Sequence, residues 1–173
     1  MHRAGFRDKL RAKGIPLKIW NTSGDAGIIA AFNVNRTGRP VSGKVSASDI
    51  PGFDGGKYVI YEYFSGLLKK MDKTTEIKFK LKPDDVVLFI LIPIRSDLTI
   101  NKYICPGTIK YSIDGASSHI VILEDKGIFG FYSDKKPEKI HINVKESDFI
   151  YRNDLYLIDC SDCEKEVVVE VFL

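Results

Sequence analysis

Two strands with different surroundings follow each other in residues 75–94, TEIKFKLKPDDVVLFILIPI. In the first half, apolar residues alternate with charged ones, so that one face is apolar. These apolar residues are Ile77, Phe79 and Leu81. A Pro-Asp-Asp turn follows, and then an apolar run from Val86 to Ile94. We therefore expect a half-solvated strand over Thr75–Leu81 and a buried central strand over Val86–Ile92.

Short apolar runs and turns continue along the rest of the chain. The 173 residues include 21 Ile and 12 Val against 12 Leu and 7 Ala, and β-branched side chains pack better on a pleated surface than on a helix. Gly24-Asp25 predicts a hairpin turn, and strands spaced by about 8–12 residues predict an all-β fold, a two-sheet antiparallel β-sandwich. The remaining candidate strands are Leu17–Trp20, Gly27–Val34, Lys44–Ser46, Tyr58–Phe64, Leu98–Ile104, Thr108–Ile113, His119–Glu124, Gly127–Tyr132, Lys139–Val144, Asp148–Tyr151, Leu155–Ile158 and Val167–Phe172.

A basic segment, residues 1–14, precedes the sandwich, which we assign to residues 15–173. Residues 2–13 predict a short helix with Phe6 and Leu10 at i and i+4, ended by Gly14. The first 20 residues carry six bases and one acid, and residues 146–173 carry eight acids and two bases. Because these charges are segregated, the net charge of +3 is weak support for a nucleic-acid partner.

The residues that could carry catalysis are few and scattered. The histidines, His2, His119 and His141, have no metal-ligand spacing, and the carboxylates, such as Asp84-Asp85, lie in turns. No phosphate-binding glycine motif and no nucleophile motif is present. We therefore expect no cofactor, no metal and no catalytic residue in this chain. No apolar run approaches the roughly 18 residues that span a membrane.

The three cysteines are Cys105, Cys160 and Cys163. They are too few, and odd in number, for a disulfide framework, which favours a reducing, cytoplasmic setting. Residues 160–163 form a C-x-x-C motif in an acidic turn. A zinc site normally needs four ligands and a redox motif normally opens a helix, so we interpret these cysteines as structural. Metal binding and redox chemistry remain the alternatives.

Aromatic residues make up 11% of the chain, and several lie close together in Tyr58–Phe64. They could form a platform on which sugars stack, although filling of the sandwich core is the simpler interpretation. The basic N-terminal segment with Phe6 and Trp20 could bind nucleic acid, but such surfaces interleave several aromatics with bases along one face. We regard a nucleic-acid partner as the weakest alternative.

Three motifs in a fixed order are more specific than any of these features. They are LKIWN at residues 17–21, GIIAAFNV at 27–34 and GIFGFYSDKKP at 127–137. In this order they resemble the C-terminal region of the raffinose synthase / seed imbibition protein family, the α-galactosidase-like enzymes of glycoside hydrolase family 36. The resemblance runs from about residue 15 to 173. Residues 103–107 depart from it, because YICPG replaces an Asn-x-Gly-Gly type of turn.

The resemblance implies a non-catalytic accessory domain. In that family a β-sandwich lies downstream of a (β/α)₈ barrel, and the barrel strands carry the catalytic aspartates. No catalytic residue carries over, so no catalysis is expected from this chain alone. The expected partner is a catalytic barrel polypeptide, contacted through exposed apolar residues, for which Phe6, Leu10 and Trp20 are the candidates. The alternative function is a stand-alone carbohydrate-binding module that binds galactosides.

Overall fold

The protein is all-β, as the sequence predicts. The computed structural model describes residues 14–53, 56–94, 100–101, 109–115, 117–163 and 166–173. The chain divides into two compact units, Met1–Leu91 and Ile92–Leu173, whereas the sequence predicts one accessory domain over residues 15–173. Within the described residues the only helical element is a single 3₁₀ turn, and no helix is long and apolar enough to span a membrane. The helix predicted over residues 2–13 lies outside the described residues.

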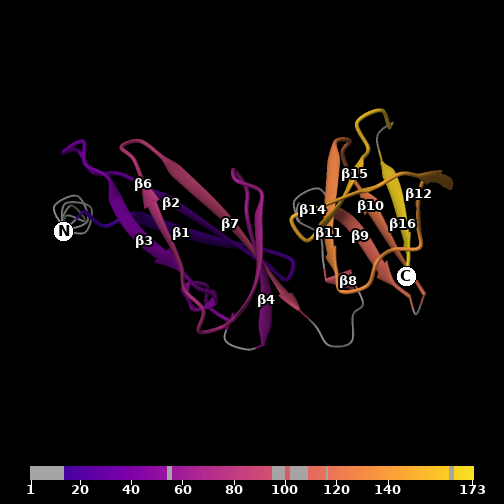
Figure 1. Ribbon diagram of the computed structural model, residues 1–173, viewed down its shortest axis with the longest axis horizontal. Coiled ribbons are helices and arrows are strands. Elements are labelled where there is room, and N and C mark those ends of the chain that lie inside the picture. The colour runs from indigo at the N-terminus through magenta and orange to yellow at the C-terminus, as the bar shows by residue number, and fades with distance from the viewer. Residues whose placement is uncertain (1–13, 54–55, 95–99, 102–108, 116, 164–165) are drawn as a thin grey trace, which may run out of the picture. The chain divides into compact units, whose positions relative to one another are not determined.

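The first unit contains two sheets. Five strands form one sheet in the order β1-β2-β7-β4-β5, and β3 pairs with β6 in a separate two-stranded sheet (Figure 1). The elements are β1 (Leu17–Ser23), β2 (Ala26–Phe32), β3 (Val41–Val45), the 3₁₀ turn η1 (Ala47–Asp49), β4 (Lys57–Glu62), β5 (Leu67–Asp72), β6 (Ile77–Leu81) and β7 (Val86–Ile94, of which Val86–Leu91 belong to this unit). The hairpin predicted at Gly24 joins β1 and β2, and β7 lies between β2 and β4.

Both sheets of the first unit contribute to a single core. Alternate residues of β7 point into it, as a sheet with one face on a core requires, and Leu81 of β6 joins them with Phe79 packed alongside. The apolar face predicted for Thr75–Leu81 is thus confirmed. The buried members are Ile29, Ala31, Val41, Val45, Ala47, Ile50, Tyr58, Ile60, Met71, Leu81, Val87, Phe89 and Leu91.

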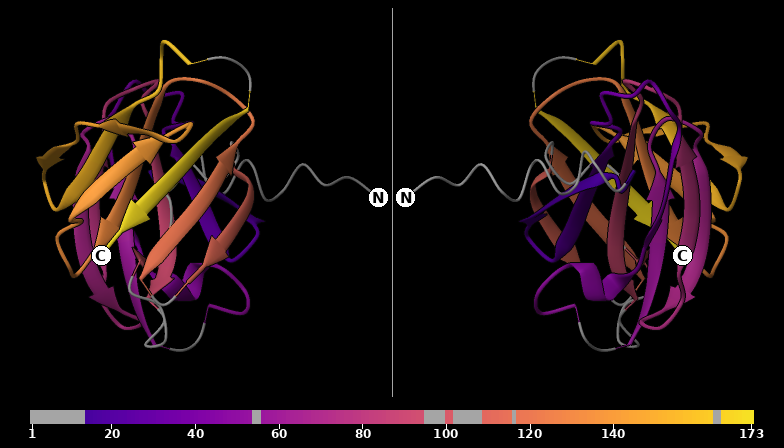
Figure 2. Two further views of the ribbon diagram at one scale, coloured as in Figure 1. Left: turned by 90° about the vertical axis from the view of Figure 1, so that its right-hand side faces the viewer. Right: turned by 90° about the vertical axis from the view of Figure 1, so that its left-hand side faces the viewer.

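The second unit also contains two antiparallel sheets. One has the order β13-β12-β16-β10-β9 and the other the order β14-β15-β11-β8. In Figure 2 the yellow strand β16 lies between its orange neighbours β10 and β12. The strands are β8 (Ile100–Asn101), β9 (Ile109–Asp114), β10 (Ser118–Leu123), β11 (Ile128–Ser133), β12 (Lys139–Ile142), β13 (Lys145–Ser147), β14 (Ile150–Arg152), β15 (Leu155–Asp159) and β16 (Val167–Phe172).

A second core lies within the second unit. Val167, Val169 and Val171 of β16 enter it from one sheet, and Phe129 and Phe131 of β11 enter it from the other. The alternation of buried and half-buried residues along β16 is the period-2 pattern of a strand with one face on a core. The strand expected over Leu98–Ile104 overlaps β8, but most of that range lies outside the described residues.

Candidate functional site

An exposed edge strand carries Trp20, the one predicted interface residue that lies within the described residues. The strand β1 is the first in its sheet, and the side chains of Ile19 and Trp20 are 53% and 49% exposed. Trp20 pairs in register with the fully buried Ile29, so its side chain lies on the core side of the sheet at the open edge. Phe6 and Leu10, the other predicted interface residues, lie outside the described residues.

A cleft of about 460 Å³ opens beside this strand, and no local pattern in the sequence predicts it. Three segments distant in sequence line it, namely the start of β1, the strand β3 and the strand β6. Three of its side chains are lysines, and no acidic side chain is among the described residues that line it. The lining residues are Ile15, Pro16, Lys18, Ser42, Gly43, Lys44 and Lys78.

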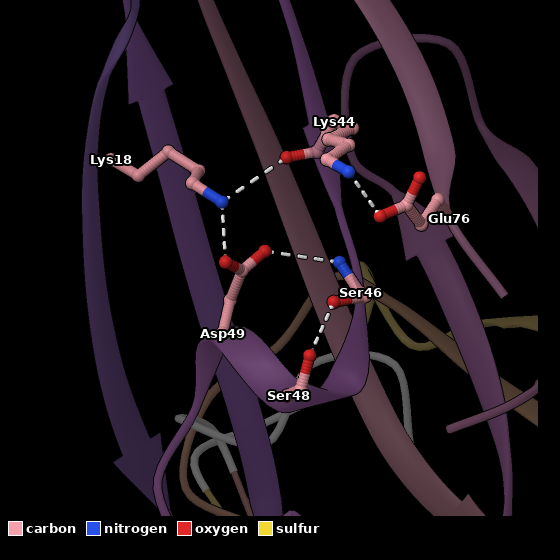
Figure 3. Close-up of polar contacts among 6 residues, drawn as sticks. All are labelled: Lys18, Lys44, Ser46, Ser48, Asp49 and Glu76. Carbon is pink, nitrogen blue, oxygen red and sulfur yellow. Dashed lines mark hydrogen bonds and ion pairs between the residues drawn. The ribbon is translucent and has the colours of Figure 1, made fainter. Parts of the chain in front are cut away.

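Lys18 is held in place by a polar network at one wall of the cleft (Figure 3). Its ammonium donates to the carbonyl oxygen of Lys44 at 3.2 Å and forms an ion pair with Asp49 of η1. The second carboxylate oxygen of Asp49 accepts the Ser46 N–H at 3.0 Å, and the Ser46 hydroxyl lies 2.8 Å from that of Ser48. Lys18 is therefore oriented before any ligand arrives.

Lys44 of β3 and Lys78 of β6 lie directly opposite each other and form a cross-strand pair of like charges, here called the lysine rung. They are register partners, so both side chains project from the same face of the two-stranded sheet. Lys44 is paired with Glu76 (Figure 3), whereas Lys78 has no ion pair within the part of the chain that the structure describes. Directly opposed like charges destabilise a strand pair, and Glu76 offsets the charge of Lys44 but pairs with no other lysine of the cleft within the described residues.

Gly43 allows Pro16 to pack closely against β3. A Cβ atom at this position would lie 2.6 Å from Pro16 Cγ and 2.6 Å from Phe79 Cζ, too close for any real side chain. Because glycine has no side chain, Gly43 lets the segment just before β1 approach β3 closely, and this approach shapes the cleft.

Asn33, the asparagine of the quoted GIIAAFNV motif, ties three segments of the first unit together. Its amide group donates to the carbonyl oxygens of Arg39 at 3.0 Å, Lys82 at 2.9 Å and Leu81 at 3.3 Å. Its carbonyl oxygen accepts the Asn35 N–H at 2.9 Å. The side chain is buried, so each of these bonds satisfies a group that is shielded from water. The motif residue thus has a structural role.

The C-x-x-C motif lies in a turn between β15 and β16, as predicted. The Cys163 N–H donates to the Cys160 carbonyl oxygen at 3.2 Å, and the Cys160 N–H donates to the Gly127 carbonyl oxygen at 2.8 Å. Cys160 is buried in the second core and both thiols are free. Burial, followed by the nearby Cys163 thiol and Asp159 carboxylate, raises the pKa of the Cys160 thiol to about 11. The described residues contain no group of three or more metal-ligating side chains.

The described histidines lie in strands of the second unit and are not grouped. His119 is buried in β10. His141, in β12, contacts the Phe172 ring edge-on with centroids 5.0 Å apart, and its Nδ1 lies 3.9 Å from a Glu170 carboxylate oxygen. That neither histidine belongs to a site stays a prediction.

The Tyr58–Phe64 aromatics divide between core and surface. Tyr58 is buried and stacks on Phe53 with ring centroids 5.7 Å apart. Tyr63 and Phe64 are exposed after the end of β4, with their rings edge-to-face and 5.4 Å apart. The core-filling interpretation therefore holds for Tyr58, and the exposed pair remains available as a surface feature.

The chain is similar to two plant enzymes that are much longer than itself. It is 28% identical over 182 residues to probable galactinol–sucrose galactosyltransferase 4 of Arabidopsis thaliana, a match that covers 83% of this chain and 21% of the relative. It is 21% identical over 189 residues to probable galactinol–sucrose galactosyltransferase 1 of the same plant. That match covers 88% of this chain and 25% of the relative. The chain thus spans about a fifth to a quarter of these relatives. No family model matches it.

Solved structures offer only a distant likeness. A β-porphyranase of glycoside hydrolase family 86 from the gut bacterium Bacteroides plebeius covers 91% of this chain, with 13% identity and a TM-score of 0.25 over 34% of its own length. BuGH86 in complex with neoagarooctaose also covers 91% of this chain, with 13% identity and a TM-score of 0.27, and the match takes in 31% of its own length. These TM-scores are too low to indicate a shared fold. By sequence, however, the chain resembles galactinol–sucrose galactosyltransferases, of the raffinose synthase family, over most of its length.

Proposed function

We propose that the chain is a non-catalytic β-sandwich part of an α-galactosidase-like enzyme and that it packs against a catalytic barrel. One observation carries the proposal. The galactosyltransferase match covers 83% of this chain and only 21% of the relative, so the chain corresponds to one piece of a larger enzyme. In each unit, two antiparallel sheets share one core, which supports the sandwich arrangement.

The surroundings of two acidic residues argue against their use as the general acid of a glycosidase. The hydroxyl groups of Thr74 and Thr75 donate to Asp72 at 2.7 and 2.9 Å and lower the pKa of its carboxyl group. Hydrogen bonds from Ser161 likewise lower the pKa of Asp159. A glycosidase acid needs a raised pKa so that it is protonated when it meets the leaving group. These two carboxylates cap turns instead.

The edge strand β1 is the surface that we assign to the partner. An edge strand leaves backbone N–H and C=O groups unpaired along one side, and exposed Ile19 and Trp20 add apolar area to them. A partner strand or loop could bury both kinds of group at once. The predicted interface residue Trp20 lies on this strand.

Co-expression with the α-galactosidase-like catalytic polypeptide of the same genome tests the proposal. We expect the two chains to co-elute, and we expect Ile19→Asp to abolish co-elution by placing a charge in the contact. Ile128→Asp is the matched control, because Ile128 is also an exposed isoleucine, at 65% against 53% for Ile19, but lies in the second unit. Lack of co-elution, or equal loss in the control, would contradict the assignment.

An activity assay tests the non-catalytic part of the proposal. The purified chain should not hydrolyse an aryl α-galactoside. Turnover that disappears when one of its own Asp or Glu residues is replaced would show that the chain is itself an enzyme.

A stand-alone galactoside-binding module is the second candidate. The exposed Tyr63–Phe64 pair favours it, because sugar rings stack on exposed aromatic faces. Titration with galactosides, followed by the chemical shifts of these two side chains, separates the two functions. Saturable binding that is lost in Tyr63→Ala/Phe64→Ala, together with no binding to the catalytic polypeptide, would favour the module.

A further inference from the structure

We propose that the lysine-lined cleft between β1, β3 and β6 binds a small organic oxyanion, a phosphate or carboxylate carried on a ring or short chain. The cleft belongs to the first unit alone, and Ile19 and Trp20, the side chains assigned to the barrel contact, do not line it. Its volume of about 460 Å³ lies within the roughly 300–1,000 Å³ of pockets that hold small molecules.

Lys18 supplies a preoriented donor. An ammonium group has three N–H bonds, and Lys18 directs two of its contacts to the Lys44 carbonyl oxygen and the Asp49 carboxylate. One N–H therefore remains for a ligand. Because the side chain is already fixed, binding loses little of its conformational entropy.

The rung formed by Lys44 and Lys78 supplies the unbalanced charge. Glu76, which does not line the cleft, forms an ion pair with Lys44, and Lys78 has no ion pair within the described residues. An oxyanion between the two ammonium groups would replace their repulsion by two charge-assisted hydrogen bonds. Such bonds are stronger than those to a neutral hydroxyl group, so the geometry selects an anion over a neutral sugar.

The floor of the cleft indicates that the ligand is more than a bare ion. Ile15 is exposed there and Pro16 packs over Gly43. Together they give the cleft an apolar surface, the apolar ledge, next to the lysines in its lining. A ring or a short carbon chain would cover this ledge and gain the free energy of removing it from water. Inorganic phosphate would leave the ledge exposed and should bind more weakly.

The test compares galactose 1-phosphate, glucuronate, inorganic phosphate and neutral galactose as probes of the whole chain. Amide chemical shifts at low ionic strength report which probe binds and where. We expect saturable shifts at residues 15, 17, 18, 42–44 and 78 with an organic anion, weaker shifts with inorganic phosphate and none with galactose. The response to galactose 1-phosphate against glucuronate tells a phosphate ligand from a carboxylate ligand.

Two lysines on one strand provide the matched variants. Lys78→Met removes the unpaired charge but keeps the length of the side chain, and it should weaken binding about tenfold because one charge-assisted hydrogen bond is lost. Lys80→Met removes a charge that is also exposed and lies on the same face of β6, outside the cleft lining, and it should leave binding unchanged. Neither lysine forms an ion pair within the described residues, so both variants should fold.

Three results would overturn the proposal. The first is no saturable shift with any anion up to about 10 mM. The second is equal weakening by the two substitutions, which would mean a diffuse field of charge in place of a site. The third is binding of galactose as tight as that of its phosphate. None of these results bears on co-elution with a catalytic polypeptide, so the two proposals fail separately.

Discussion

Replacing Asn33 by Ala should be among the most damaging single substitutions in the first unit. The side chain is 5% exposed, and three of its hydrogen bonds, to Arg39, Lys82 and Asn35, are 3.0 Å or shorter. At about 1 kcal/mol for each bond, their loss lowers the free energy of unfolding by about 3 kcal/mol. The whole free energy of unfolding of a typical domain is only about 5–15 kcal/mol.

Urea unfolding followed by tryptophan fluorescence measures this loss, because the single tryptophan, Trp20, lies in β1 of the same unit. With an m-value of about 1–2 kcal/mol per M, the midpoint should fall by roughly 1.5–3 M. Asn21→Ala is the control, since the exposed Asn21 makes one local bond, to the Thr22 N–H. It should cost less than about 0.5 kcal/mol. An equally small effect of Asn33→Ala would refute the reasoning.

Three further outcomes are expected. Val144 is 89% exposed and has a φ of +65°, which strains a β-branched residue but not glycine. Val144→Gly should therefore stabilise the second unit by about 1 kcal/mol and raise its melting temperature, and a lowered melting temperature would contradict this. Hydrogen bonds from two threonines lower the pKa of Asp72, so its contribution to stability is present above the unfolded value of 3.8 and is lost as pH falls through the folded value. Native protein and Asp72→Asn should therefore converge in stability on acidification, and a constant difference would exclude the effect. At neutral pH a thiol reagent should label Cys163 faster than Cys160, whose pKa burial raises to about 11, and peptide mass mapping that finds the reverse order would show the second core to be open.

Local patterns in the sequence were sufficient to predict most strands and the overall class. The apolar residues of Thr75–Leu81 lie in a strand that faces the core, and the run from Val86 lies in the central strand β7. The first strand shows alternation of apolar and charged residues, and the second shows an unbroken apolar run. Both patterns can be read from adjacent residues. The structural interpretation of the histidines rested likewise on local spacing.

The strand β5 shows where a local pattern fails. In Leu67–Asp72 the buried residues are Leu68 and Met71, which are three positions apart and therefore lie on opposite faces of the strand. Lys69 and Lys70 separate them. The segment shows no alternation, and only its pairing with β4 makes it a strand. This edge strand is defined by its hydrogen-bonded neighbour and not by its own pattern.

Tertiary structure alone decided the cleft and the division of the chain into two cores. Lys18 meets Asp49 across 31 positions, and Lys44 meets Glu76 across 32. Before folding, these lysines are indistinguishable from the other solvent-facing bases of a basic chain. Alternation indicates which face of a strand is buried, because it depends on adjacent residues. Which strands become neighbours depends on contacts between distant segments, and those contacts brought three lysine residues to one cleft.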